Sequence, residues 1–149
     1  MTARTSGAQP PPDARLLAMA HSPDVADRLR ACAGLAGVDA AWAVAALREL
    51  LYDAHDLAPM REAARALLER GDQGWDWVLE AVWRSGGPAE AHTLAAPITD
   101  RLSDGRDAEA RLQERATRSA SPAARRGAME VQMILGIRPM EYIRDEDEQ

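Results

Sequence analysis

Apolar residues with helical spacing recur along most of the chain, and this spacing limits the possible folds more than any other feature. Segment 58–70 shows it best, with apolar residues at positions i, i+3, i+4, i+7 and i+8: Met60, Ala63, Ala64, Leu67 and Leu68. Segments 38–51, 88–103 and 121–135 carry similar stripes. A stripe of this kind covers one face of an amphipathic helix, whereas the alternation typical of strands is missing. The sequence therefore predicts an all-α fold.

Prolines stand near the expected helix starts at similar intervals. Four of them, separated by 36, 29 and 34 residues, are Pro23, Pro59, Pro88 and Pro122. Proline is favoured at the first position of a helix, because its missing N–H would have no intrahelical acceptor there. Helix pairs repeating every 30–40 residues or so are typical of an α-solenoid. Pro97 falls off the stripe of segment 88–103, so we expect it to kink that helix on its outer side or to split it.

Two segments carry a more specific pattern. Residues 50–82 read LLYDAHDLAPMREAARALLERGDQGWDWVLEAV, and residues 121–136 read SPAARRGAMEVQMILG. The Leu-Leu pair, the Asp-containing loop, Pro59, Arg61 and the Gly-Asp before a second apolar helix resemble a HEAT repeat. This resemblance implies an all-α, short HEAT-like right-handed α-solenoid of about three helix pairs, with a concave surface lined by the second helix of each pair. Residues 101–120 fit the pattern least.

The charge of the chain is unevenly distributed. The net charge is −6, yet residues 101–138 carry eight Arg against five Asp and Glu. A nucleic-acid-binding domain normally has a basic excess over its fold, so the overall balance disfavours nucleic acid as a partner. We expect the helical repeat domain to span residues 13–143, after a disordered leader at 1–12 and before an acidic tail at 144–149.

Other features of the composition narrow the class of protein further. Cys32 is the only cysteine, which suits a reducing compartment, and no apolar stretch approaches the length of a membrane span. We therefore expect a cytoplasmic protein. The sequence has no phosphate-binding glycine loop and no zinc-ligand spacing, so we expect no cofactor and no metal.

Three of the four tryptophans lie in segment 74–83. Trp75 shares a helical face with Val78, Leu79 and Val82, and Trp83 lies beside that face, so we expect packing roles in a chain that has no Phe. Trp77 points to the other side, about 200° away from Trp75 on a helical wheel. The stretch is therefore predicted to be mostly core, with Trp77 as its candidate contact residue.

We predict that the chain binds another protein through the concave face of the solenoid, as a non-enzymatic scaffold, adaptor or inhibitor. Rigid helices lose little conformational freedom when they bind. The candidate contact residues are Arg61, Arg65, Trp77, Arg125 and Met129. Met129 lies off the apolar stripe of its helix, and Met side chains adapt to varied partners.

For each of the three candidate arginines, a structural role is an alternative to partner binding. Arg61 is placed to bond Asp53 or Asp56 in the preceding loop, and Arg65 is placed to pair with glutamates on its own helix. Arg125 belongs to the basic segment, which either binds an acidic partner or neutralises the acidic tail of the chain itself.

One enzymatic alternative stays open. His21, the pair His55-Asp56 and Asp100 follow the H…HD…D order of the HD-domain phosphohydrolases, which they resemble. That family is also all-helical, and two His with two Asp can hold a divalent ion that generates hydroxide. Against this interpretation, His21 stands just before a Ser-Pro turn, and no apolar run precedes His55.

Overall fold

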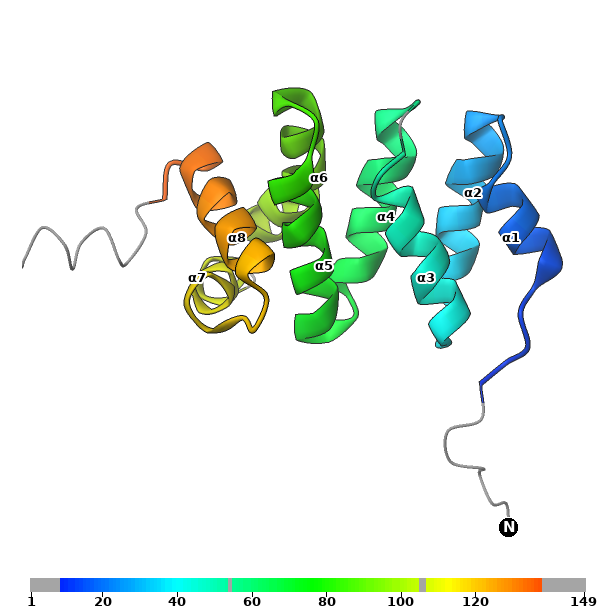
Figure 1. The fold of residues 1–149 in the computed structure, drawn as a ribbon, viewed down its shortest axis with the longest axis horizontal. Helices are drawn as coiled ribbons and strands as arrows, with labels where there is room; N and C mark the ends of the chain where they lie inside the picture. The colour runs from blue at the N-terminus through cyan, green and yellow to red at the C-terminus, as the bar shows by residue number, and fades with distance from the viewer. Residues whose placement is uncertain (1–8, 54, 105–106, 138–149) are drawn as a thin grey trace, which may run out of the picture. The chain divides into compact units, whose positions relative to one another are not determined.

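The fold is helical throughout the part of the chain that the computed structural model describes, residues 9–53, 55–104 and 107–137 (Figure 1). Those residues contain eight α-helices and no strand, so the all-α prediction is confirmed. The helices are α1 (Ala14–Ala20), α2 (Val25–Ala36), α3 (Ala41–Leu50), α4 (Leu57–Leu68), α5 (Gly71–Arg84), α6 (Pro88–Ser103), α7 (Ala108–Arg118) and α8 (Pro122–Ile134).

The chain divides into two compact units, Met1–Ala66 and Leu67–Gln149. In the first unit, α1 packs on α2 and α3, and α2 packs on α3. The centre of this unit is formed by fully buried leucines, among them Leu35, Leu47 and Leu51. Buried Cys32 of α2 lies 3.6 Å from the carbonyl oxygen of Pro59, which places the start of α4 beside α2.

In the second unit, α5 packs against α6 and α8, and α7 packs against α8. Figure 1 shows α8 (orange) beside α5 (green). The interior is filled by Trp75 and by large aliphatic side chains such as Leu79, Ile98 and Leu112. The packing role predicted for Trp75 is thus confirmed, because only 2% of this residue is exposed.

The prolines mark helix starts less uniformly than predicted. Pro88 and Pro122 are the first residues of α6 and α8, as expected. Pro23 precedes α2 instead, because the Asp24 side chain caps that helix by accepting from the N–H of Ala26 at 3.0 Å. Pro59 is the third residue of α4, where a missing N–H is still harmless because first-turn donors have no intrahelical acceptor.

The expectation that Pro97 splits its helix or lies on the outer side of it is wrong. It lies inside α6, which runs without a break from Pro88 to Ser103, and its side chain is buried. The buried face of α6 is wider than the predicted stripe, because it includes Pro97 as well as stripe residues such as Leu94 and Ile98. Proline has no N–H to leave unpaired, so this apolar ring can be buried within the unit.

The segment that fits the repeat pattern least, 101–120, contains a regular helix, α7. Its buried residues include Leu112 and, beside it, the charged Arg115. At the other end of the chain, two residues of the predicted leader contact α3: Gln9 accepts from the N–H of Ala41, and the carbonyl of Pro10 accepts from the indole N–H of Trp42. Residues 1–8 of that leader and the predicted acidic tail lie outside the described residues.

No helix among the described residues is long and apolar enough to cross a lipid bilayer.

Candidate functional site

A close contact between α5 and α8 creates the surface of greatest interest in the second unit. Gly127 of α8 lies directly against the backbone of α5, and a Cβ atom at this position would stand 1.8 Å from the carbonyl oxygen of Leu79. Only a glycine permits this approach. Trp83 lies one helical turn after Leu79 on α5, and Arg126 immediately precedes Gly127 on α8.

Trp83 and Arg126 contact each other at the surface. The guanidinium carbon of Arg126 lies 5.3 Å from the centre of the Trp83 ring, within the range of a cation–π interaction. Trp83 is nevertheless 45% exposed, and Arg126 is exposed as well. Among the residues that the structure describes, Arg126 has no carboxylate partner.

Two methionines extend this surface along α8. Met133 follows Arg126 by seven residues, two helical turns, and is 74% exposed. Met129 lies between them and is half-buried. We call Trp83, Arg126, Met129 and Met133 the α5–α8 surface.

Hydrogen bonds fix the turn between α7 and α8 against α5. The hydroxyl of Ser119 donates to Asp76 at 2.9 Å, and the hydroxyl of Ser121 donates to Glu80 at 2.7 Å. Arg125 donates to the carbonyl oxygen of Ser119 at 2.6 Å. The start of α8, and with it Arg126, is therefore held in place before any partner binds.

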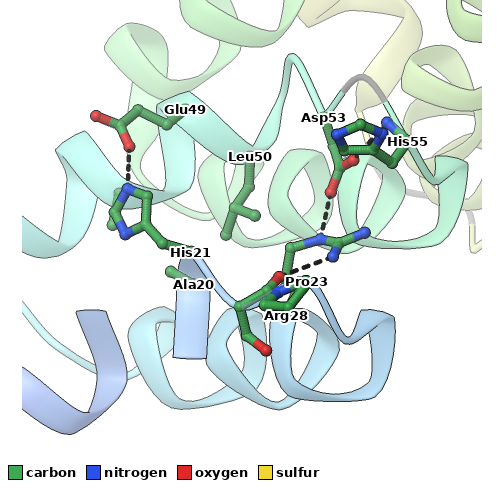
Figure 2. A pocket seen from close by; sticks show the side chains of 10 residues that line it. Ala20, His21, Pro23, Arg28, Glu49, Leu50, Asp53 and His55 are labelled. Carbon is green, nitrogen blue, oxygen red and sulfur yellow. Dashed lines mark hydrogen bonds and ion pairs between the residues drawn. The ribbon is translucent and has the colours of Figure 1, made fainter. Parts of the chain in front are cut away.

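The first unit contains an open hollow of about 400 Å³ (Figure 2). His21 lies at one side of it, where Nε2 is 2.9 Å from a carboxylate oxygen of Glu49 and Nδ1 is 2.8 Å from the carbonyl oxygen of Leu17. The hydrogen bond with Leu17, followed by that with Glu49, raises the pKa of His21 above its ordinary value, because both acceptors favour the doubly protonated ring.

On the other side of the hollow, buried Arg28 binds three groups. Its Nε donates to Asp53 at 2.7 Å, Nη1 donates to the carbonyl oxygen of Ser22 at 2.9 Å, and Nη2 donates to Asp56. Burial opposes ionisation of Asp53, but the backbone N–H groups of His55 and Asp56 and the charge of Arg28 outweigh it and hold its pKa below the ordinary value. These polar groups satisfy one another, which indicates a structural cluster.

The five candidates for protein binding are distributed over both units. Arg61 and Arg65 are exposed on α4 in the first unit, and Arg65 pairs with Glu62 at 3.6 Å. Trp77 of α5, with Arg125 and Met129 of α8, belongs to the second unit, and all three are half-buried. Of the five, Met129 belongs to the α5–α8 surface, whereas Arg125 holds the preceding turn.

Several important residues were not among the five candidates. The loop carboxylates expected for Arg61 are bound by Arg28 of α2, and the most exposed Trp of segment 74–83 is Trp83. The one sequence signal for the exposure of Trp83 is its place in the last turn of α5, followed by Arg84 and the Ser-Gly-Gly of the next loop. Arg28 has no such signal, because its partners lie 25 and 28 residues away.

Of the residues of the enzymatic alternative, His21 and His55 line the hollow of the first unit, but His21 and Asp56 are bound to other partners. His21 bonds Leu17 and Glu49, and Asp56 pairs with Arg28. In the ranges that the structure describes, which include all four residues of the alternative, no group of three or more His, Cys, Asp or Glu is arranged to hold a metal ion.

Comparisons of the chain with protein-family models, with curated proteins and with solved structures find no match.

Proposed function

We propose that this chain is a non-enzymatic protein-binding module, a HEAT-like α-solenoid of helix pairs that serves as an adaptor or an inhibitor in the cytoplasm. The single observation that carries the proposal is the exposed Trp83 with Arg126 over its ring. Trp and Arg, together with Tyr, are the residue types most enriched among those that dominate binding energy at protein interfaces.

The surroundings of this pair also support a binding role. Trp83 lies on a regular helix, and hydrogen bonds from Ser119 and Ser121 hold the start of α8 against α5. A surface held in this way loses little conformational freedom on association, so more of its contact energy appears as affinity. Exposed Met133 adds a flexible apolar side chain that adapts to a partner.

Affinity capture from the source cells, followed by mass spectrometry, will identify the partner, and variants will then show whether it uses this surface. We expect Trp83→Ala to weaken binding of the purified partner at least ten-fold, with unchanged helicity by circular dichroism. Tyr52→Ala is the matched control, because Tyr52 is an aromatic residue of the first unit with 47% exposure. Equal binding by both variants and by Met133→Glu would refute the proposal.

A further inference from the structure

In the described part of the second unit, Arg111 and Arg126 each lie over a tryptophan ring, and of these two only Arg111 has a carboxylate partner among the described residues. The guanidinium carbon of Arg111 is 5.4 Å from the centre of the Trp75 ring, and the same guanidinium donates to Asp72 at 3.0 Å. Arg126 lies over Trp83 at 5.3 Å without such an acceptor among the described residues. The first pair shows that a guanidinium over an indole still has N–H donors for a carboxylate.

A second arginine close to Trp83 in sequence is also available to an anionic partner. Arg84, the neighbour of Trp83 at the end of α5, is exposed and, like Arg126, has no carboxylate partner in the described ranges. Glu80, three residues before Trp83, accepts a hydrogen bond from Ser121. Glu130, one helical turn after Arg126 on α8, is half-buried. The segment that contains α8, residues 101–138, has eight Arg against five Asp and Glu.

We propose that the α5–α8 surface binds an acidic segment of a partner protein. An Asp or Glu of that segment pairs with the N–H donors of Arg126, and an adjacent apolar side chain packs on Trp83 and Met133. This inference rests on the proposed protein-binding function and adds the chemistry of the partner. A protein segment is favoured over nucleic acid because the exposed arginines named near Trp83 are two, Arg84 and Arg126, whereas nucleic acid is bound by many basic residues along its phosphate backbone.

A random library of displayed 12-residue peptides, selected on the full-length protein, tests the inference without a known partner. We expect the selected peptides to combine Asp or Glu with a large apolar residue. Their Kd should rise at least ten-fold with Arg126→Ala and also with Trp83→Ala, and it should rise as NaCl is increased from 50 to 500 mM. Arg126→Lys should restore binding only in part, because Lys keeps the charge but lacks the planar fork of donors.

Arg118→Ala is the matched control, since Arg118 is an exposed arginine of the same unit that also has no carboxylate partner among the described residues; its effect should stay within two-fold. Neutral peptides that depend on Trp83 but not on Arg126 would overturn the acidic partner and leave protein binding intact. Failure to select peptides, or peptides indifferent to both residues, would overturn both proposals. Arg126-dependent competition by duplex DNA would overturn the assignment to a protein segment.

Discussion

At the scale of single residues, Gly127 determines how closely α8 approaches α5. The site for its missing Cβ is occupied by the backbone of Leu79, which cannot rotate away as a side chain would. The close approach brings Arg126 over Trp83. One residue without a side chain is therefore a condition for the exposed pair on which the proposed function depends.

We predict that Gly127→Ala destabilises the protein by about 2 kcal/mol or more, because the added methyl group forces α5 and α8 apart. In a helix without this contact, replacing Gly by Ala would stabilise the protein by roughly 0.5–1 kcal/mol. A loss of stability in Gly127→Ala would therefore come from the packing of α8 on α5. Urea denaturation followed by circular dichroism measures the change. Gly37→Ala is the control: a Cβ there meets nothing within 4 Å, and its effect should be small.

Leu67 provides a second test of packing. Its side chain is fully buried, whereas Leu57 at the start of the same helix is 43% exposed. Leu67→Ala should cost about 2–5 kcal/mol through loss of apolar burial and formation of a cavity. Leu57→Ala should cost much less in the same thermal and urea experiments. Similar values for the two variants would mean that the stripe of segment 58–70 is not the buried face.

The tryptophans show where single-residue prediction succeeds and where it ends. The helical wheel predicts the burial of Trp75, and the structure confirms it. Trp83 lies only about 40° from Leu79 on the same wheel, so its stripe predicts burial as well. Its exposure depends on where α8 crosses α5, which is a property of tertiary packing and is not encoded in the periodicity of either helix.

At the scale of elements, apolar periodicity predicts helices better than it predicts their ends. Segments 38–51, 58–70, 88–103 and 121–135 coincide with α3, α4, α6 and α8 to within one or two residues at most boundaries. The starts of α2 and α4 differ from the prediction because capping by Asp24 and the tolerance of the first turn for proline decide them locally. The Arg28 cluster was not predicted, since its loop partners are distant in sequence.

The Arg28 cluster connects α2 with the loop after α3, and we predict that Asp53→Asn destabilises the protein by about 1–3 kcal/mol at pH 7. The variant removes one of the two carboxylates that Arg28 binds and leaves Asp56 as its remaining counter-ion. Thermal and urea unfolding will measure the loss. Asp39→Asn, at an exposed loop position of the same unit, should have little effect.

The same substitution should change the response to acid. Because the folded state lowers the pKa of Asp53, its carboxylate contributes stability above the unfolded pKa of about 3.9, and this contribution is lost as the pH falls through the lower folded value. Below pH 4, the wild-type protein should therefore lose stability more steeply than Asp53→Asn. Parallel acid unfolding curves for the two proteins would contradict this assignment of the depressed pKa.

At the scale of the whole molecule, the all-α class was predictable because four amphipathic stripes and missing strand patterns exclude other classes.

Cys32, the only cysteine of the chain, is buried and can therefore be used as a chemical probe of unfolding. Burial, with smaller contributions from the charges of Glu62 and Asp53, raises the pKa of its thiol to about 12. Since the thiolate is the reactive species, native Cys32 should be inert at neutral pH.

We predict that Ellman's reagent modifies native Cys32 at pH 8 at least about a hundredfold more slowly than the unfolded chain, because reaction requires opening of the helices around α2. Absorbance of the released thionitrobenzoate measures the rate with and without guanidinium chloride. Rapid stoichiometric modification of the native protein would show that Cys32 is accessible and that the packing of α2 beside α4 is wrong.

The contrast between the two arginine-covered indoles has an optical consequence. The fluorescence of a hydrated indole is shifted to longer wavelength than that of a buried one, so Trp83 should emit at the red edge of the spectrum and Trp75 at the blue edge. A ligand that covers Trp83 excludes water from its ring and moves the red component toward the blue. Occupancy of the α5–α8 surface should therefore be readable from the native emission of the protein, without a dye.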